Sequence, residues 1–262
     1  LQEAGLHPVW ATMLFFALGA LMIGLWRPGV VRTVLGQPAL LVLALVSGVS
    51  NATFNWGVAT GDVVRVVLLF YLMPLWAALL ARVMLNEQIT RAAWWRMGLA
   101  LSGAILVLKP EGQAWPQFGS LSDVLGLLGG MGFAMTNVML RQQSQQPAVS
   151  RAFAMFAGCT LLPGLLGLVL SWQGLVNPWP AFTWAWGALV LAMAGIFFAS
   201  NLALQYGAAK LPVQLTSVLM ITEVLFAAVS AALWGEATLT PSVLMGGGLI
   251  LSAALLAARS EH

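Results

Sequence analysis

Long apolar runs separated by short polar turns fill almost the whole chain. A helix needs about 20 mostly apolar residues to cross the hydrocarbon of a bilayer, and nine segments approach or exceed that length. Their limits are 8–26, 39–59, 63–84, 92–109, 121–140, 149–171, 183–206, 212–234 and 241–258. Because the turns are short, neighbouring helices are expected to be antiparallel. The pattern predicts an all-α integral membrane protein.

The composition agrees with lipid as the solvent. Of the 262 residues, 60% are hydrophobic and only 7% are charged, whereas soluble domains carry about 25% charged residues. The net charge of +3 is not gathered in a basic helix, so nucleic-acid binding is not expected. The two histidines, His7 and His262, lie at the chain ends, and the single cysteine, Cys159, lies in an apolar run. The sequence therefore indicates no metal, no cofactor and no enzyme.

The basic residues are divided unequally between the two sets of turns. If the first segment runs from outside to inside, only Arg65 and Lys109 fall outside. The cytoplasmic side then holds Arg27, Arg32, Arg82, Arg91, Arg96, Arg141, Arg151, Lys210 and Arg259. Such a bias is typical of cytoplasmic loops and predicts a multi-pass protein of the bacterial inner membrane with a cytoplasmic C-terminus. Arg65 is interpreted as a snorkelling interfacial residue or as an attractor for substrate carboxylates.

The chain contains an internal repeat. The matching pairs are Asn51 with Asn201, Gly57 with Gly207, Ala59 with Ala209, 98–104 with 248–254, and Glu87 with Glu236. Glu87 is expected inside and Glu236 outside, so the two repeats are inverted, an arrangement common among secondary transporters. The sequence predicts one repeat over residues 1–110 and an inverted one over 111–262.

Small residues recur on the last segment of each repeat. Gly98 and Ser102 match Gly248 and Ser252, and such spacing lets helix backbones approach closely. We expect the two repeat-final helices to pack against each other. The two glycines at 129–130 and the three at 246–248 indicate similar close packing.

Two blocks that end in glutamate carry a family resemblance. They run from Tyr71 to Glu87 and from Thr222 to Glu236, and the helix that begins at Ser122-Asp123 and ends at Arg141 adds to them. The chain resembles the EamA-type branch of the drug/metabolite transporter superfamily. The resemblance implies a fold of five plus five helices and a secondary transporter. The sequence Tyr71-Leu72-Met73-Pro74 is similar to YddG-type aromatic amino acid exporters.

Glu223 is the strongest candidate for chemistry. It lies halfway along segment 212–234, where an ionised acid costs about 2.5–3.5 kcal/mol to insert. The family usually has proline at this position, which matches Pro74 of the first repeat. Glu223 is expected to bind a substrate ammonium group or a proton. Alternatively, it stays protonated and bonds a neighbouring helix.

Two pairs of amides form equivalent polar faces. Asn55 lies one turn beyond Asn51, and Gln205 lies one turn beyond Asn201, so each pair shares a face. We expect these faces either to line a central aqueous pocket or to tie helices together. Tyr71, Met73, Pro74 and Trp76 fall near the middle of the third segment. Pro74 is expected to act as a gate hinge, and the aromatic rings either stack on substrate or pack against neighbours.

The predicted function is secondary transport by alternating access, with export of small metabolites. Amino acids, including aromatic ones, are the favoured substrates. Another solute class (a drug, sugar or nucleotide-type metabolite) and a channel are the alternatives. The expected partners are a small-molecule substrate and the bilayer, and the protein is expected to be a monomer or homodimer.

The segment 121–140 opens the second repeat and has no counterpart in the first. We therefore expect nine of ten helices to be present in this sequence, with the first one encoded before Leu1. Mass spectrometry of the intact protein from its native host should detect this additional apolar segment. An N-terminus without it would contradict the five-plus-five arrangement.

Overall fold

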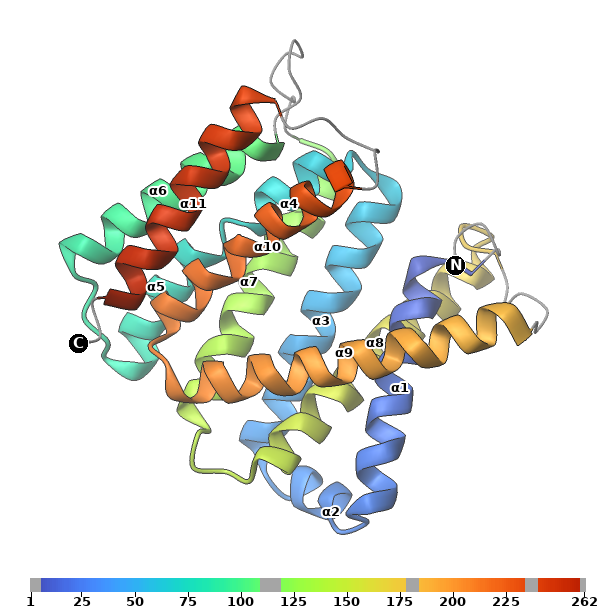
Figure 1. Ribbon diagram of the computed structural model, residues 1–262. Helices are drawn as coiled ribbons and strands as arrows, with labels where there is room; N and C mark the ends of the chain where they lie inside the picture. The colour runs from blue at the N-terminus through green and yellow to red at the C-terminus, as the bar shows by residue number, and fades with distance from the viewer. Residues whose placement is uncertain (1–5, 109–118, 178–183, 234–239, 260–262) are drawn as a thin grey trace.

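The computed structural model describes residues 6–108, 119–177, 184–233 and 240–259, and over these residues the regular structure is entirely helical (Figure 1). The helices are α1 (Pro8–Trp26), α2 (Val30–Leu35), α3 (Pro38–Thr60), α4 (Val63–Phe70), α5 (Met73–Leu85), α6 (Arg91–Leu108), α7 (Leu121–Gln142), α8 (Ala148–Trp172), α9 (Trp184–Lys210), α10 (Val213–Leu233) and α11 (Pro241–Arg259).

The predicted segments are confirmed as helices, with small differences at their ends. Within the described residues, six spans are long and apolar enough to cross a membrane, and α4 and α5 together make one of them, from Arg65 to Leu85. The short helix α2 was not predicted, because six residues between two prolines leave no hydropathy signal. Lys109 and Glu236, which were predicted to lie on the outer side, are outside the described residues.

The third predicted segment is broken rather than continuous. The helix α4 ends at Phe70, Tyr71 and Leu72 form a turn, and α5 begins at Met73. Pro74 occupies the first turn of α5, where its missing N–H costs nothing within that helix. The chain therefore changes direction just before the proline and not at a kink within one helix.

The helix α7 packs on α3 and α4 through glycines. A side chain at Gly126 would lie 2.8 Å from the Val66 carbonyl oxygen, and one at Gly130 would lie 2.5 Å from that of Phe70. The hydroxyl of Ser50 on α3 donates to the carbonyl of Gly129 at 2.8 Å. The close packing predicted for Gly129-Gly130 is confirmed, and only glycine allows this backbone approach.

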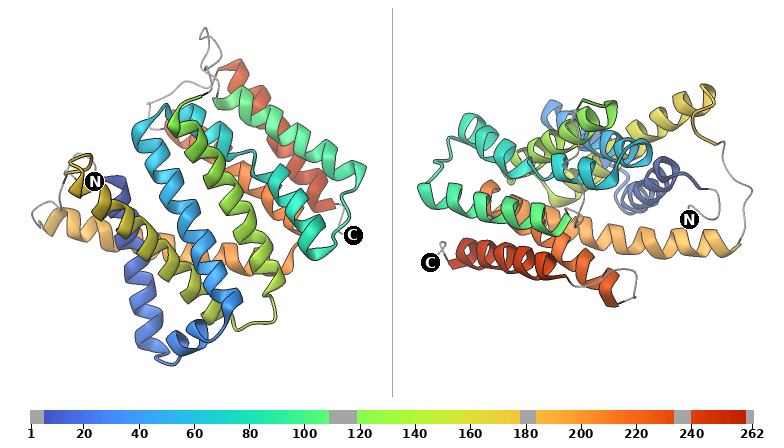
Figure 2. Two further views of the ribbon diagram at one scale, coloured as in Figure 1. Left: turned by 180° about the vertical axis from the view of Figure 1, so that it is seen from behind. Right: turned by 90° about the horizontal axis from the view of Figure 1, so that it is seen from above.

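The helices α6 and α11 lie side by side in every view (Figure 1 and Figure 2). Their contact uses Gly103 and Gly246, because a Cβ on either would lie 2.6 Å from the other's carbonyl oxygen. Gly98 and Gly248 have no neighbour within 4 Å of such a Cβ. The predicted pairing of these two helices is therefore correct, but two of the residues assigned to it face elsewhere.

Three apolar clusters fill the interior. The first joins α5, α6, α7, α10 and α11 around Met73, Met97 and Ile221. The second joins α1, α2, α3 and α8 around Leu43 and Phe156. The third lies between α1, the end of α8 and α9. The helix α9 crosses α3 and α7 at a steep angle (Figure 1) and is the least buried of the long spans.

The two α6 glycines provide a matched test of the helix contact. Gly103→Ala would push a methyl group into the α11 backbone and is expected to lower the free energy of unfolding by about 1–3 kcal/mol. Gly98→Ala adds the same methyl group to the same helix in open space and should leave stability unchanged or slightly higher. Unfolding of both variants in mixed micelles measures the difference. Equal stability of the two variants would contradict the observed packing.

Candidate functional site

A groove between α9 and α10 contains Glu223, the acidic residue within a membrane span that was predicted as a candidate site. This α9–α10 groove has a volume of about 570 Å³. Its polar residues are Ser200, Asn201, Thr222 and Glu223, and its apolar residues are Ile196, Phe197, Leu204, Leu219, Met220 and Phe226. Glu223 is exposed to the groove near the midpoint of α10. The predicted residues Asn201 and Glu223 therefore share one site.

Two groups in the α9–α10 groove bond to their own helices. The Asn201 amide donates to the Phe197 carbonyl at 3.1 Å, and the Thr222 hydroxyl donates to the Leu219 carbonyl at 2.6 Å. Within the described part of the chain, no cationic side chain forms an ion pair with Glu223. The carboxylate is thus available to an external cation.

The break between α4 and α5 lies near this groove. Tyr71 follows the last residue of α4, is 6% exposed, and lies close enough to Glu223 for an electrostatic interaction. Met73 and Pro74 are buried, and Met73 belongs to the same cluster as Ile221 of α10. Trp76 is half-buried, and its indole N–H is buried with no acceptor among the described residues. Direct contact of these residues with a substrate stays a prediction.

The first pair of amides lies between helices. The Asn51 amide of α3 donates to the Cys159 sulfur of α8 at 3.1 Å and to the Ser47 carbonyl at 3.3 Å. The Asn55 amide donates to the Asn51 carbonyl at 2.8 Å. Only the bond from Asn51 to Cys159 joins two helices, and the other two lie within α3. Pocket lining by Asn51 and Asn55 stays a prediction.

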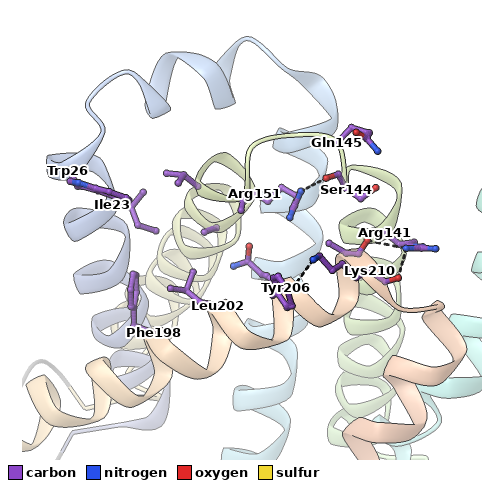
Figure 3. A pocket seen from close by; sticks show the side chains of 15 residues that line it. Ile23, Trp26, Arg141, Ser144, Gln145, Arg151, Phe198, Leu202, Tyr206 and Lys210 are labelled. Atoms are coloured by element: carbon purple, nitrogen blue, oxygen red, sulfur yellow. Dashed lines mark hydrogen bonds between the residues drawn. The ribbon is translucent and has the colours of Figure 1, made fainter. Parts of the chain in front are cut away.

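Gln205 lies in a different cavity from Asn201. This second space, the α7–α9 cavity, has a volume of about 600 Å³ and lies where α7, α8 and α9 meet (Figure 3). Gln205 is 3% exposed, and neither its amide nitrogen nor its amide oxygen has a hydrogen-bond partner in the described structure. The two amides of α9, which lie one turn apart, therefore line different spaces: Asn201 lines the α9–α10 groove and Gln205 lines the α7–α9 cavity.

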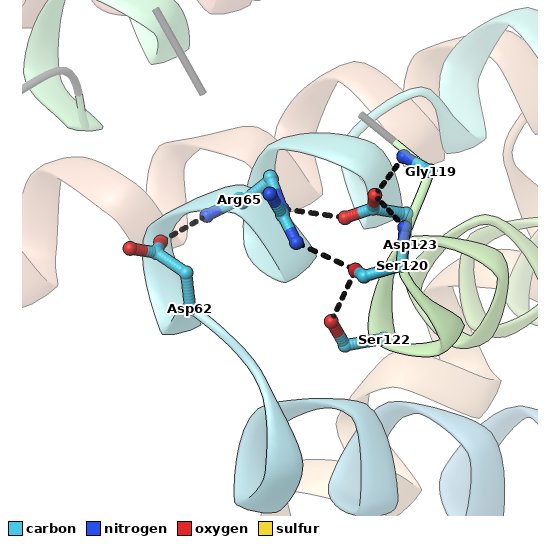
Figure 4. Close-up of polar contacts among 6 residues, drawn as sticks. All are labelled: Asp62, Arg65, Gly119, Ser120, Ser122 and Asp123. Atoms are coloured by element: carbon cyan, nitrogen blue, oxygen red, sulfur yellow. Dashed lines mark hydrogen bonds and ion pairs between the residues drawn. The ribbon is translucent and has the colours of Figure 1, made fainter. Parts of the chain in front are cut away.

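An ion pair joins α4 to α7 at one end of the molecule (Figure 4). The Arg65 Nε lies 2.5 Å from the Asp123 carboxylate, which also accepts from the N–H groups of Gly119 at 2.6 Å and Ser120 at 2.9 Å. Asp62 caps α4 by accepting from the Arg65 N–H at 2.9 Å. Arg65 is thus bound by Asp123 and Ser120 of the protein itself, a contact that neither the snorkelling role nor the substrate-attracting role predicted for it includes.

A looser polar contact lies at the other end. The Arg141 guanidinium approaches the Glu87 carboxylate at 4.0 Å and donates to the carbonyls of Ala209 and Lys210 at 3.1 and 2.7 Å. Burial raises the pKa of Glu87, opposed by the lowering effects of Arg141 and of the Val213 N–H. Arg141 therefore connects the ends of α5, α7 and α9.

One buried polar residue was missed by the sequence analysis. Asn137 of α7 is 1% exposed, and neither end of its amide has a partner among the described residues. Its position inside the apolar run 121–140 was a usable signal, because an unpaired buried amide costs about 1–3 kcal/mol.

Comparisons with known proteins found similarities to transporters. Residues 3–109 match the EamA-like transporter family. The Pseudopaline exporter CntI of two Pseudomonas aeruginosa strains is 28% identical over 185 residues, which cover 69% of this chain and 62% of the exporter. The chain thus aligns with less than two thirds of that exporter's length.

Two further proteins are similar over more of the chain. An uncharacterized transporter of Archaeoglobus fulgidus is 27% identical over 231 residues, 86% of this chain and 78% of the relative. A protein of known crystal structure superposes with a TM-score of 0.75, covers 99% of this chain and 91% of its own, and is 19% identical. The last comparison shows a shared fold.

Removal of Asp123 should destabilise the α4–α7 contact. The side chains of Arg65 and Asp123 are 16% and 6% exposed, so Asp123→Ala would leave a nearly buried guanidinium without its counter-ion, at a cost of about 3 kcal/mol. A double-mutant cycle with Arg65→Gln, measured by unfolding in mixed micelles, should reveal the coupling. Asp62→Asn keeps a capping side chain and serves as the control. Additive effects of Asp123→Ala and Arg65→Gln would contradict the pairing.

Proposed function

We propose that this chain, a membrane transporter with an EamA-like domain of the drug/metabolite transporter superfamily, is a secondary carrier that exports small amine-bearing metabolites. The favoured substrates are amino acids, including aromatic ones. The observation that carries the proposal is the Glu223 carboxylate, which lies midway along α10 and is exposed to the α9–α10 groove beside Asn201.

The chemistry of the groove favours a substrate ammonium group. A carboxylate within a membrane span is costly unless it pairs with a cation or meets water, so such acids usually mark a transport path. An ammonium group would neutralise Glu223, and the Asn201 amide would supply a neutral hydrogen-bonding partner. The groove also suits the rest of an aromatic amino acid, since Phe226 is 73% exposed and offers a ring face for stacking. Phe197 lines the same groove but stacks on Phe15, with ring centroids 5.1 Å apart.

Transport would follow alternating access between two inverted repeats, residues 1–110 and 111–262. The break at Tyr71-Leu72 supplies a turn near the groove. Pro74, in the first turn of α5, restricts the backbone conformation directly after this turn. Broken helices of this kind often border the substrate site of secondary transporters. We place the end that carries Arg141, Arg151 and Lys210 in the cytoplasm of a bacterial cell, because basic residues accumulate on that side.

A second candidate substrate follows from the comparisons. The similarity to a pseudopaline exporter favours pseudopaline, or a solute like it, as cargo. This candidate shares the export direction with the first and differs in the chemistry of the solute.

Replacement of one carboxylate tests the proposal. Proteoliposomes that contain the purified protein should take up labelled phenylalanine or another amino acid with saturation and counterflow, with and without a pH gradient. Glu223→Gln keeps the shape and removes the charge, and is expected to reduce the initial rate by at least about tenfold, equivalent to about 1.4 kcal/mol.

Glu87→Gln is the matched control, because it makes the same chemical change at the end of α5, away from the groove. It should leave the initial rate within about twofold of the unaltered protein. If Glu223→Gln transports at the normal rate with the same pH dependence, Glu223 does not bind the substrate ammonium or a coupling proton. Uptake of pseudopaline and not of amino acids would favour the second candidate.

A further inference from the structure

The α7–α9 cavity has basic side chains and no acidic ones. Figure 3 shows Trp26, Ile23 and Phe198 on one side of it, with Arg151 and Lys210 on the other. Among the described residues that line the cavity, the charged ones are Arg141, Arg151 and Lys210, all cationic. The space therefore combines an apolar wall with a concentrated positive charge.

The basic groups bond mainly to neutral atoms. Arg151 is 5% exposed, and one of its terminal nitrogens donates to the carbonyls of Gln143, Ser144 and Gln146 at 3.1, 2.9 and 2.6 Å. Lys210 donates to the Tyr206 hydroxyl at 2.7 Å. Carbonyl and hydroxyl oxygens satisfy hydrogen bonds but do not neutralise charge, and a buried charge without a counter-ion is costly.

One carboxylate lies beside this group of basic side chains. Glu87 lies 4.0 Å from Arg141, and it is not among the residues that line the cavity. Arg151 and Lys210 have no acidic partner in the described part of the chain. Arg151 therefore keeps a buried positive charge with no acidic partner among the described residues, and the exposed Lys210 adds a second, solvent-accessible one.

Two buried polar groups at the cavity also lack partners. Gln205 lines the cavity and is only 3% exposed. Neither its amide nitrogen nor its amide oxygen has a hydrogen-bond partner among the described residues. The Nε of Arg151 is likewise buried without an acceptor. Buried polar groups in folded proteins are almost always hydrogen-bonded, so the unpartnered N–H donors of Gln205 and Arg151 at the same cavity indicate a ligand that accepts hydrogen bonds.

We propose that the α7–α9 cavity is an oxyanion-binding site, which takes the carboxylate or phosphate group of a ligand whose apolar part contacts Trp26 and Phe198. Arginine pairs well with such groups because its planar N–H donors match two oxygens at once. Gln205 and Lys210 provide further donors. The ligand is either a free carboxylate metabolite or the headgroup of an anionic lipid. This site is distinct from the α9–α10 groove, whose exposed charge is negative, and does not depend on the transport function.

Binding to the purified full-length chain tests the proposal. Equilibrium dialysis of labelled citrate against protein in phosphatidylcholine nanodiscs measures the free-anion source. Native mass spectrometry, after phosphatidylglycerol in the sample is exchanged for phosphatidylcholine, measures how much phosphatidylglycerol stays bound and so tests the lipid headgroup as the ligand. Lys210→Gln and Gln205→Leu are each expected to lower the affinity for the anion about tenfold, and raised salt should lower this affinity further. Arg151 also holds the α7–α8 turn, so the two other residues give the cleaner variants.

Arg82→Gln is the matched control, because it removes one exposed positive charge from α5 at a residue that does not line the cavity. Citrate binding that is sensitive to Lys210→Gln and Gln205→Leu, and insensitive to Arg82→Gln, supports the site with a free anion. The same pattern for retained phosphatidylglycerol supports it with a lipid. If the protein binds neither citrate nor phosphatidylglycerol, or if Arg82→Gln reduces binding as much as the two cavity variants do, the proposal is overturned. Normal amino acid transport in either case would leave the proposed function intact.

Discussion

Backbone contact between α7 and its neighbours is the interaction on which the rest of the structure depends. In lipid, helices gain no hydrophobic free energy by associating, so close van der Waals packing and hydrogen bonds have to hold them together. Gly126 and Gly130 bring α7 onto the carbonyls of α4. The same helix carries Asp123 near one end and Arg141 near the other. A single helix thus fixes the ion pair with Arg65, the position of the α4 turn, and the contact with the end of α9.

The helix α9 separates two spaces of opposite charge. Asn201 lines the groove that contains Glu223, and Gln205 lines the cavity that contains the basic groups. Both residues are amides one turn apart, and their different surroundings arise because α9 crosses its neighbours at a steep angle (Figure 1). Successive turns of α9 therefore meet different helices.

The sequence predicted the spans well because insertion into lipid depends on composition along a single segment. It missed the break at Tyr71-Leu72, since hydropathy is continuous across 63–84 and the turn depends on how α7 packs there. Glu223 and Asn201 were identified because polar groups stand out inside apolar runs, and the structure places them together. The pairing of Arg65 with Asp123 could not be read, because the partners belong to helices that meet only in the folded chain. The sequence placed Asn201 and Gln205 one turn apart on α9, but in the structure they line different spaces because the neighbours of α9 change along its length.

The length of α9 has a consequence for its surroundings. Its 27 residues extend about 40 Å at 1.5 Å per residue, whereas the hydrocarbon of a bilayer is about 30 Å thick. A helix that exceeds the membrane in this way accommodates the mismatch by tilting, and Figure 1 shows α9 at a steep angle to α3 and α7. Bilayer thickness then becomes a mechanical variable of the protein. A thinner membrane would increase the tilt of α9 and a thicker one would reduce it, and the groove and the cavity on either side of this helix would change shape together.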